Sequence, residues 1–95
     1  MYKKTKEGFI IGRIAHGEDL LQGILKVAKK ENITLGRVEA IGALQRATIS
    51  YYYQDIKKYD SITFEEPMEI ISLLGNISIK DGEPMVHAHV SLGNS

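Results

Sequence analysis

The sequence contains no cysteine and no apolar run long enough to cross a membrane. Without cysteine there is neither a disulfide framework nor a thiolate metal site, so histidine and carboxylate are the side chains left as metal ligands. The basic stretch 1–6 precedes only a short apolar run, broken by Gly12 and Arg13, which is typical of neither a signal peptide nor a membrane span. A cytoplasmic location with no membrane partner is therefore expected.

Net charge is also lacking, because twelve basic residues balance twelve acidic ones. The chain as a whole then has no field that would draw it to DNA or to an anionic membrane. DNA contact would need cations clustered on one surface. The candidates are spread along the chain among acidic residues, which favours solvated faces: Lys3, Lys4, Lys6, Lys26, Lys29, Lys30, Lys57 and Lys58.

One main helix is predicted within a single domain of this length. Apolar residues recur at helical spacing from Glu18 to Lys30 and form one stripe. The acidic start and basic end of this segment complement the helix dipole, and Asn32 is suited to a left-handed stop.

The rest of the chain has β-type patterns. Gly42 is expected to form a bend or bulge between two of them. The expected fold class is α/β of the α+β type, with a mainly antiparallel sheet of about five strands and one helix packed on it. The segments concerned are Phe9–Ile14, Arg37–Ile41, Leu44–Tyr53, Tyr59–Phe64, Met68–Lys80 and the residues after Gly82.

Two histidines stand two residues apart after the strongest hairpin signal, Asp81-Gly82. Side chains alternate along a strand, so His87 and His89 share one face while Val86 and Ala88 share the other. The pair is a candidate metal half-site. Alternatively, the two imidazoles simply hydrogen-bond to neighbouring polar side chains.

A two-residue turn would also set the register of this hairpin. Its polar face would then place Asn76 opposite His87 and Ser72 opposite Ser91. Its apolar face would combine Ile71, Leu73, Gly75 and Ile77 with Val86, Ala88, Val90 and Leu92.

Four blocks of the chain resemble the plant and prokaryote conserved (PPC) domain: Gly17 to Leu20, Ile41 to Leu44, Glu69 to Ile77 and Asp81 to Val90. The resemblance implies an α/β unit with a mainly antiparallel sheet that assembles as a homotrimer. It also implies a stand-alone prokaryotic protein associated with DNA; plant members carry the domain beside an AT-hook.

The resemblance further implies zinc as a cofactor. In similar prokaryotic members the His-x-His strand is followed by a hairpin with Gly-Gly-His, and the three histidines hold the metal. His87 and His89 match the first two, and the sequence stops at Ser95, before that third histidine. Residues 1–95 are thus expected to form a single PPC-like domain that lacks its last strand or strands. His16 is a weak candidate for the third ligand, and the carboxylate of Glu39 is another.

The function expected from these observations is that of a stand-alone PPC-domain, DNA-associated protein with a His-x-His half-site for a divalent metal. Two alternatives stay open. The first is a zinc-dependent enzyme or small-ligand-binding trimer with no role on DNA, and the second is a purely structural trimerising module. A nucleophilic enzyme is disfavoured, because the chain has neither cysteine nor a Gly-x-Ser-x-Gly elbow.

Overall fold

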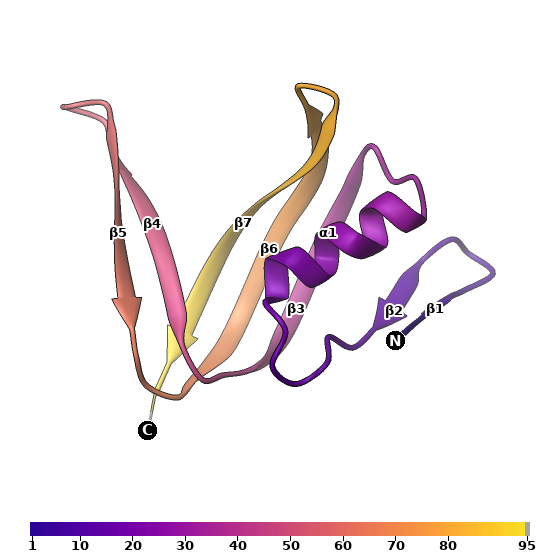
Figure 1. Cartoon of the computed structure of the whole chain (residues 1–95), viewed down its shortest axis with the longest axis horizontal. Coiled ribbons are helices and arrows are strands. Elements are labelled where there is room, and N and C mark those ends of the chain that lie inside the picture. The colour runs from indigo at the N-terminus through magenta and orange to yellow at the C-terminus, as the bar shows by residue number, and fades with distance from the viewer. Residues whose placement is uncertain (95) are drawn as a thin grey trace. The chain divides into compact units, whose positions relative to one another are not determined.

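The computed structural model describes residues 1–94, and for Tyr51 and Tyr52 it describes the backbone alone. Strands pair as β1–β2, as β4–β5 and as a three-stranded sheet of order β3-β6-β7 (Figure 1). The α+β class is confirmed, although the strands outnumber the five expected. The elements are β1 (Tyr2–Lys4), β2 (Ile10–Gly12), α1 (Leu20–Lys30), β3 (Gly36–Leu44), β4 (Ala47–Tyr53), β5 (Lys58–Phe64), β6 (Met68–Lys80) and β7 (Glu83–Gly93).

The chain divides into two compact units, which are described separately. The first contains Met1–Arg37 and Asn76–His87, and the second contains Val38–Gly75 and the residues from Ala88 on. No helix within residues 1–94 is long and apolar enough to cross a membrane.

In the first unit, α1 begins and ends at local signals in the sequence. The carboxylate of Asp19 caps the helix by accepting a hydrogen bond from the backbone N–H of Gln22 at 3.0 Å. Asn32, just after the helix, has φ +55°, as expected for a left-handed stop. The helix lies close to the preceding loop at Gly23, where an added Cβ would come within 2.7 Å of Ile14 Cδ1.

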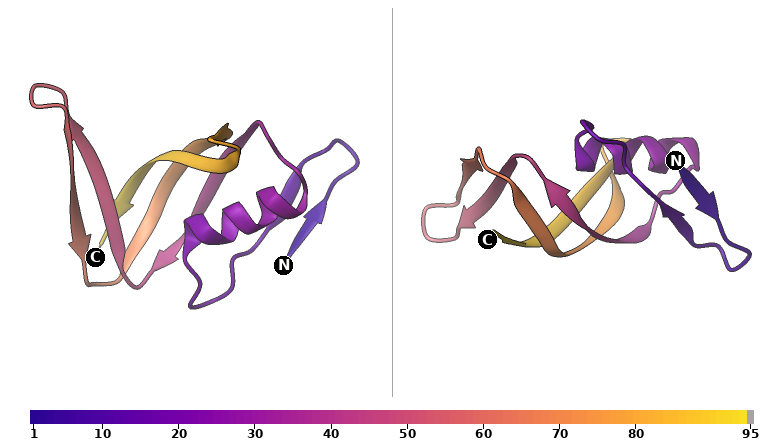
Figure 2. Two further views of the ribbon diagram at one scale, coloured as in Figure 1. Left: turned by 45° about the horizontal axis from the view of Figure 1, so that its top comes forward. Right: turned by 90° about the horizontal axis from the view of Figure 1, so that it is seen from below.

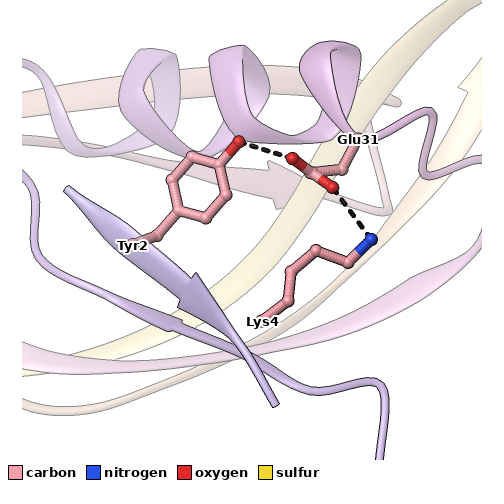
Figure 3. Close-up of polar contacts among 3 residues, drawn as sticks. All are labelled: Tyr2, Lys4 and Glu31. Atoms are coloured by element: carbon pink, nitrogen blue, oxygen red, sulfur yellow. Dashed lines mark hydrogen bonds and ion pairs between the residues drawn. The ribbon is translucent and has the colours of Figure 1, made fainter. Parts of the chain in front are cut away.

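The hairpin of β1 and β2 includes a strand that the sequence pattern did not predict. Tyr2 pairs with Gly12 in its register. The phenol of Tyr2 donates a hydrogen bond to Glu31 Oε2 at 2.6 Å, and Lys4 Nζ lies 3.2 Å from Glu31 Oε1 (Figure 3). Lys30 Nζ lies 5.8 Å from the centroid of the Tyr2 ring. These contacts fix β1 to the end of α1.

The same contacts move the pKa of both partners. The hydrogen bond to Glu31, with smaller contributions from burial and from the carboxylate charge, raises the pKa of Tyr2. The hydrogen bond from Tyr2, followed by that from Lys4, lowers the pKa of Glu31. The contacts among Tyr2, Lys4 and Glu31 are therefore strongest when the phenol is protonated and the carboxylate is ionised.

The hairpin of β6 and β7 has the two-residue turn that the sequence predicts. β6 ends at Lys80 and β7 begins at Glu83. Asp81 and Gly82 both have positive φ, +53° and +80°. Positive φ at both central residues is the signature of a type I′ turn, whose twist matches that of paired strands.

In the second unit, β4 and β5 form an antiparallel hairpin (Figure 2). Ala47 pairs with Phe64 and Ile49 with Ile62, which places these four apolar residues on one face. On the other face Thr48 pairs with Thr63, and their hydroxyl oxygens are 2.9 Å apart.

Gly42, expected to form a bend or bulge between two β segments, lies inside one strand. β3 continues through Gly42, which has φ +148°, and the break comes after Leu44, at Gln45 and Arg46. Glycine tolerates this φ, so a conformation that other residues avoid is accommodated inside a strand.

The prediction of Ile71 on the core face of β6 was also wrong. Ile71 is 62% exposed, whereas its neighbour Ile70 is 4% exposed and Leu73 is 6% exposed. Alternation is interrupted, because Ile71 and Ser72 are both exposed. Alternation from Leu73 selects Ile71 for the core, but the interruption at Ile71 and Ser72 makes Ile70 the buried residue. The side chain of Ile71 lies against Gly93.

Replacing Leu73 with alanine should destabilise the fold by about 2 to 4 kcal/mol, because its side chain is buried and a cavity would remain. The adjacent Leu74, which is 48% exposed, provides the matched control, and Leu74→Ala should cost less than about 1 kcal/mol. Urea unfolding at one protein concentration measures both. Equal losses would contradict the assignment of Leu73 to the core.

Replacing Tyr2 with phenylalanine removes the hydrogen bond to Glu31 and keeps a ring beneath Lys30. The raised pKa of Tyr2 means that this stabilisation is present below about pH 10 and disappears as pH rises through the raised pKa. The lowered pKa of Glu31 means that it is fully present above about pH 4.5 and disappears as pH falls through the lowered pKa. Melting temperatures measured from acid to alkaline pH should show the largest excess of wild type over the variant between these limits, and a shrinking excess outside them. A difference that does not change with pH would rule out the linkage.

Candidate metal-binding face of strand β7

Strand β7 carries both candidate ligands on its exposed side. His87 and His89 are exposed, whereas Val86 and Ala88 are half-buried. This alternation follows from the pleat of the strand. The division between the two units falls between His87 and Ala88, so the two histidines are related here through their shared strand.

The two-residue turn predicts which residues lie opposite the pair. Counting back from Lys80 opposite Glu83 would set Asn76 opposite His87. Both residues are exposed in the first unit. In the second unit, Ser72 and Ser91 are likewise exposed. The polar residues expected near the histidines are therefore on the solvent side of their strands.

Side chains two apart on a strand start about 6.6 Å from each other, so two imidazoles must converge to bind one ion. Neutral imidazole nitrogen is a common ligand for zinc and other divalent metals. Zinc normally takes at least three protein ligands. His87 and His89 thus fit a metal as a half-site.

A complete metal site is not found among residues 1–94, since no group of three or more histidine, aspartate and glutamate side chains there could hold an ion. His16 is exposed in the loop between β2 and α1 of the first unit, and Glu39 lies on β3 in the second. Both side chains, like those of His87 and His89, take part in non-covalent interactions. Neither is brought into a three-ligand cluster with the pair.

The second unit also has an open groove of about 410 Å³. Its lining is largely apolar and includes Leu44, Pro67, Met68 and Ile71. Glu69 is the one titratable residue that lines it. The groove has the composition of a packing surface more than that of a catalytic site.

Charge is divided unevenly between the two units, which the balanced total conceals. The first contains nine basic and six acidic residues, and the second contains three basic and six acidic residues. The first unit therefore has an excess of three positive charges, and the second has an excess of three negative charges. Sequence reasoning missed this division, because the first unit joins segments that are distant along the chain.

Comparisons with known proteins agree on one family. The model of the Plants and Prokaryotes Conserved (PCC) domain matches residues 1–95. No curated protein matches the chain.

Solved structures of similar proteins share the fold. A metal-containing protein of Archaeoglobus fulgidus is 39% identical, with a TM-score of 0.87, and the match covers 100% of this chain and 66% of that one. A plant- and prokaryote-conserved (PPC) protein of Pyrococcus horikoshii is 41% identical, with a TM-score of 0.81, over 99% of this chain and 64% of that one. A "putative DNA-binding protein" of Ralstonia eutropha is 30% identical, with a TM-score of 0.88, over 98% of this chain and 63% of that one.

The chain thus spans somewhat less than two thirds of the length of these three relatives. The family model covers every residue, and the relatives reproduce the fold at 30% to 41% identity. The chain belongs to the Plants and Prokaryotes Conserved domain family.

Proposed function

We propose that this protein is a DNA-binding member of the family that holds a divalent metal ion, with zinc the first candidate, through His87 and His89. The observation that carries the metal proposal is the exposure of both imidazoles on one side of β7. The similar protein of Archaeoglobus fulgidus, described as metal-containing, supports it.

The chain's own part in such a site is to present two imidazole nitrogens from a paired strand. The hydrogen-bonded hairpin holds the backbone of both ligands, which lowers the entropic cost of bringing them together. Bound zinc would supply either a structural link or a Lewis acid. The remaining ligands would come from outside residues 1–94 or from a second copy. Assembly as a homotrimer stays a prediction of the family resemblance.

Replacing His87 or His89 with alanine should weaken zinc binding at least tenfold, because each variant removes half of the ligands that the chain supplies. Isothermal titration with zinc, together with metal analysis of protein purified without chelator, measures the effect. His16→Ala is the matched control, since it removes an exposed imidazole that lies outside β7.

The control should bind zinc as the wild type does. If the His87→Ala, His89→Ala double variant retained the wild-type metal content, the half-site would be rejected. A loss confined to His16→Ala would relocate the site to the loop before α1.

Association with DNA is the second part of the proposal. Two observations support it: the description of the Ralstonia eutropha relative and the net positive charge of the first unit. Positively charged side chains bind DNA phosphates with the release of the counterions that surround the duplex.

Wild-type protein should bind a labelled duplex at low salt, with an affinity that falls steeply as salt rises. Each phosphate contact contributes about 0.9 to the slope of log affinity against log salt concentration. Fluorescence anisotropy at a series of salt concentrations measures this slope. An absence of binding at the lowest salt concentration would eliminate the DNA proposal and leave the metal proposal standing.

A further inference from the structure

The β1–β2 hairpin has an outer face that carries both apolar and cationic side chains. Lys3 pairs with Ile11 in the register, so their side chains lie on one side. Backbone hydrogen bonds join Thr5 to Phe9 and Met1 to Arg13, which continues the ladder at both ends. The outer face of the hairpin therefore consists of Met1, Lys3, Thr5, Phe9, Ile11 and Arg13.

Apart from half-buried Thr5, the residues of the outer face are exposed, whereas Tyr2 and Ile10 on the opposite side are in contact with the protein. Phe9 is 67% exposed and Ile11 is 68% exposed. On the opposite side Tyr2 and Ile10 are half-buried, and Tyr2 bonds to Glu31 at 2.6 Å. This contact keeps the outer face presented outward. Large exposed apolar side chains grouped with cations indicate a binding surface more than a solvated one.

The charged side chains of the outer face are all cationic. Lys3 and Arg13 lie on it and Lys6 lies in the adjacent turn, and within residues 1–94 none of the three forms an ion pair. No acidic side chain lies on the outer face, and Glu7 in the turn is the one acid in residues 1–13. The hairpin thus concentrates much of the first unit's positive charge.

Carboxylates elsewhere in the first unit are partly neutralised. Glu31 is paired with Lys4 at 3.2 Å, and Glu83 lies 3.7 Å from Lys29 Nζ. The cations of the outer face are therefore not the ones that satisfy these acids.

We propose that the outer face of the β1–β2 hairpin is the surface through which the protein contacts duplex DNA. This inference rests on the proposed DNA binding and specifies where it occurs. Lys3, Lys6 and Arg13 contact backbone phosphates, and Phe9 and Ile11 contact the edges of bases. A two-stranded β-ribbon fits the major groove, and apolar side chains there pack against thymine methyl groups.

The charge of the face favours DNA over other occupants. A second copy that met this face across a two-fold axis would oppose the same cations, which is unfavourable. In a homotrimer the face would meet a different surface of its neighbour, and sedimentation tests that case. An anionic bilayer would satisfy the same charges, but the face offers only two or three apolar anchors and a small number of cations, which gives weak binding to a membrane surface.

The test compares two pairs of substitutions in the whole chain. Lys3→Gln with Arg13→Gln should reduce the slope of log affinity against log salt by about 1.8, because two phosphate contacts are lost. Lys57→Gln with Lys58→Gln is the matched control in the second unit and should leave the slope unchanged. Phe9→Ser with Ile11→Thr should weaken binding about tenfold without changing the slope, since base contacts carry no counterions. Circular dichroism and melting curves verify that all variants are folded.

The outcomes separate this inference from the proposed function. If both hairpin variants bound DNA as tightly as the wild type, the assignment to the hairpin would be overturned while DNA binding stands. A loss of binding in the Lys57 and Lys58 control would overturn it as well. Failure of the wild type to bind would remove both. Binding to phosphatidylglycerol vesicles that the hairpin variants abolish, with unaltered DNA binding, would assign the face to membranes and overturn the inference. A change in sedimentation mass confined to the hairpin variants, with DNA binding unchanged, would assign it to self-association instead.

Discussion

The two-residue turn at Asp81 and Gly82 determines which way the histidines face. Both residues have positive φ, and the strands begin directly on either side. Because side chains alternate with a period of two, one residue more or less in the turn would move every side chain of β7 to the opposite face. Val86 and Ala88 would then be exposed and the two histidines half-buried. The candidate metal half-site therefore depends on a backbone conformation that Gly82 adopts without strain.

Elements governed by neighbouring residues could be predicted from the sequence. The left-handed stop at Asn32 and the hairpin turn depend on short-range conformational preference, and each is found where expected. The helix was expected from Glu18 and begins at Leu20, with Asp19 as its cap. Strand β1 could not be predicted, because Tyr2-Lys3-Lys4 has no apolar alternation. It is held by the bond from Tyr2 to Glu31, a residue 29 positions away. Contacts of this kind leave no local pattern in a sequence.

The candidate site could likewise be predicted only where it depends on neighbouring residues in the sequence. The alternation around His87 and His89 is a property of one strand, and the exposure of these residues agrees with it. A third ligand is a property of tertiary or quaternary structure, and residues 1–94 contain no suitable three-residue group. Ile70 and Ile71 illustrate the same limit on the apolar side, since only packing decides that Ile70 is buried and Ile71 is exposed.

The net charge of the whole chain is a poor guide to how the protein interacts with a polyanion. Twelve positive and twelve negative residues predict no attraction to a polyanion, yet the attraction between a protein and a phosphate acts over about 10 Å at moderate salt. Over that distance the local composition matters. The first unit has an excess of three positive charges, and the outer face of its hairpin has no acid. The second unit, with the opposite excess, would repel the same polyanion. For the proposed binding to DNA, the charge of the unit that makes the contact therefore matters more than the zero net charge of the chain.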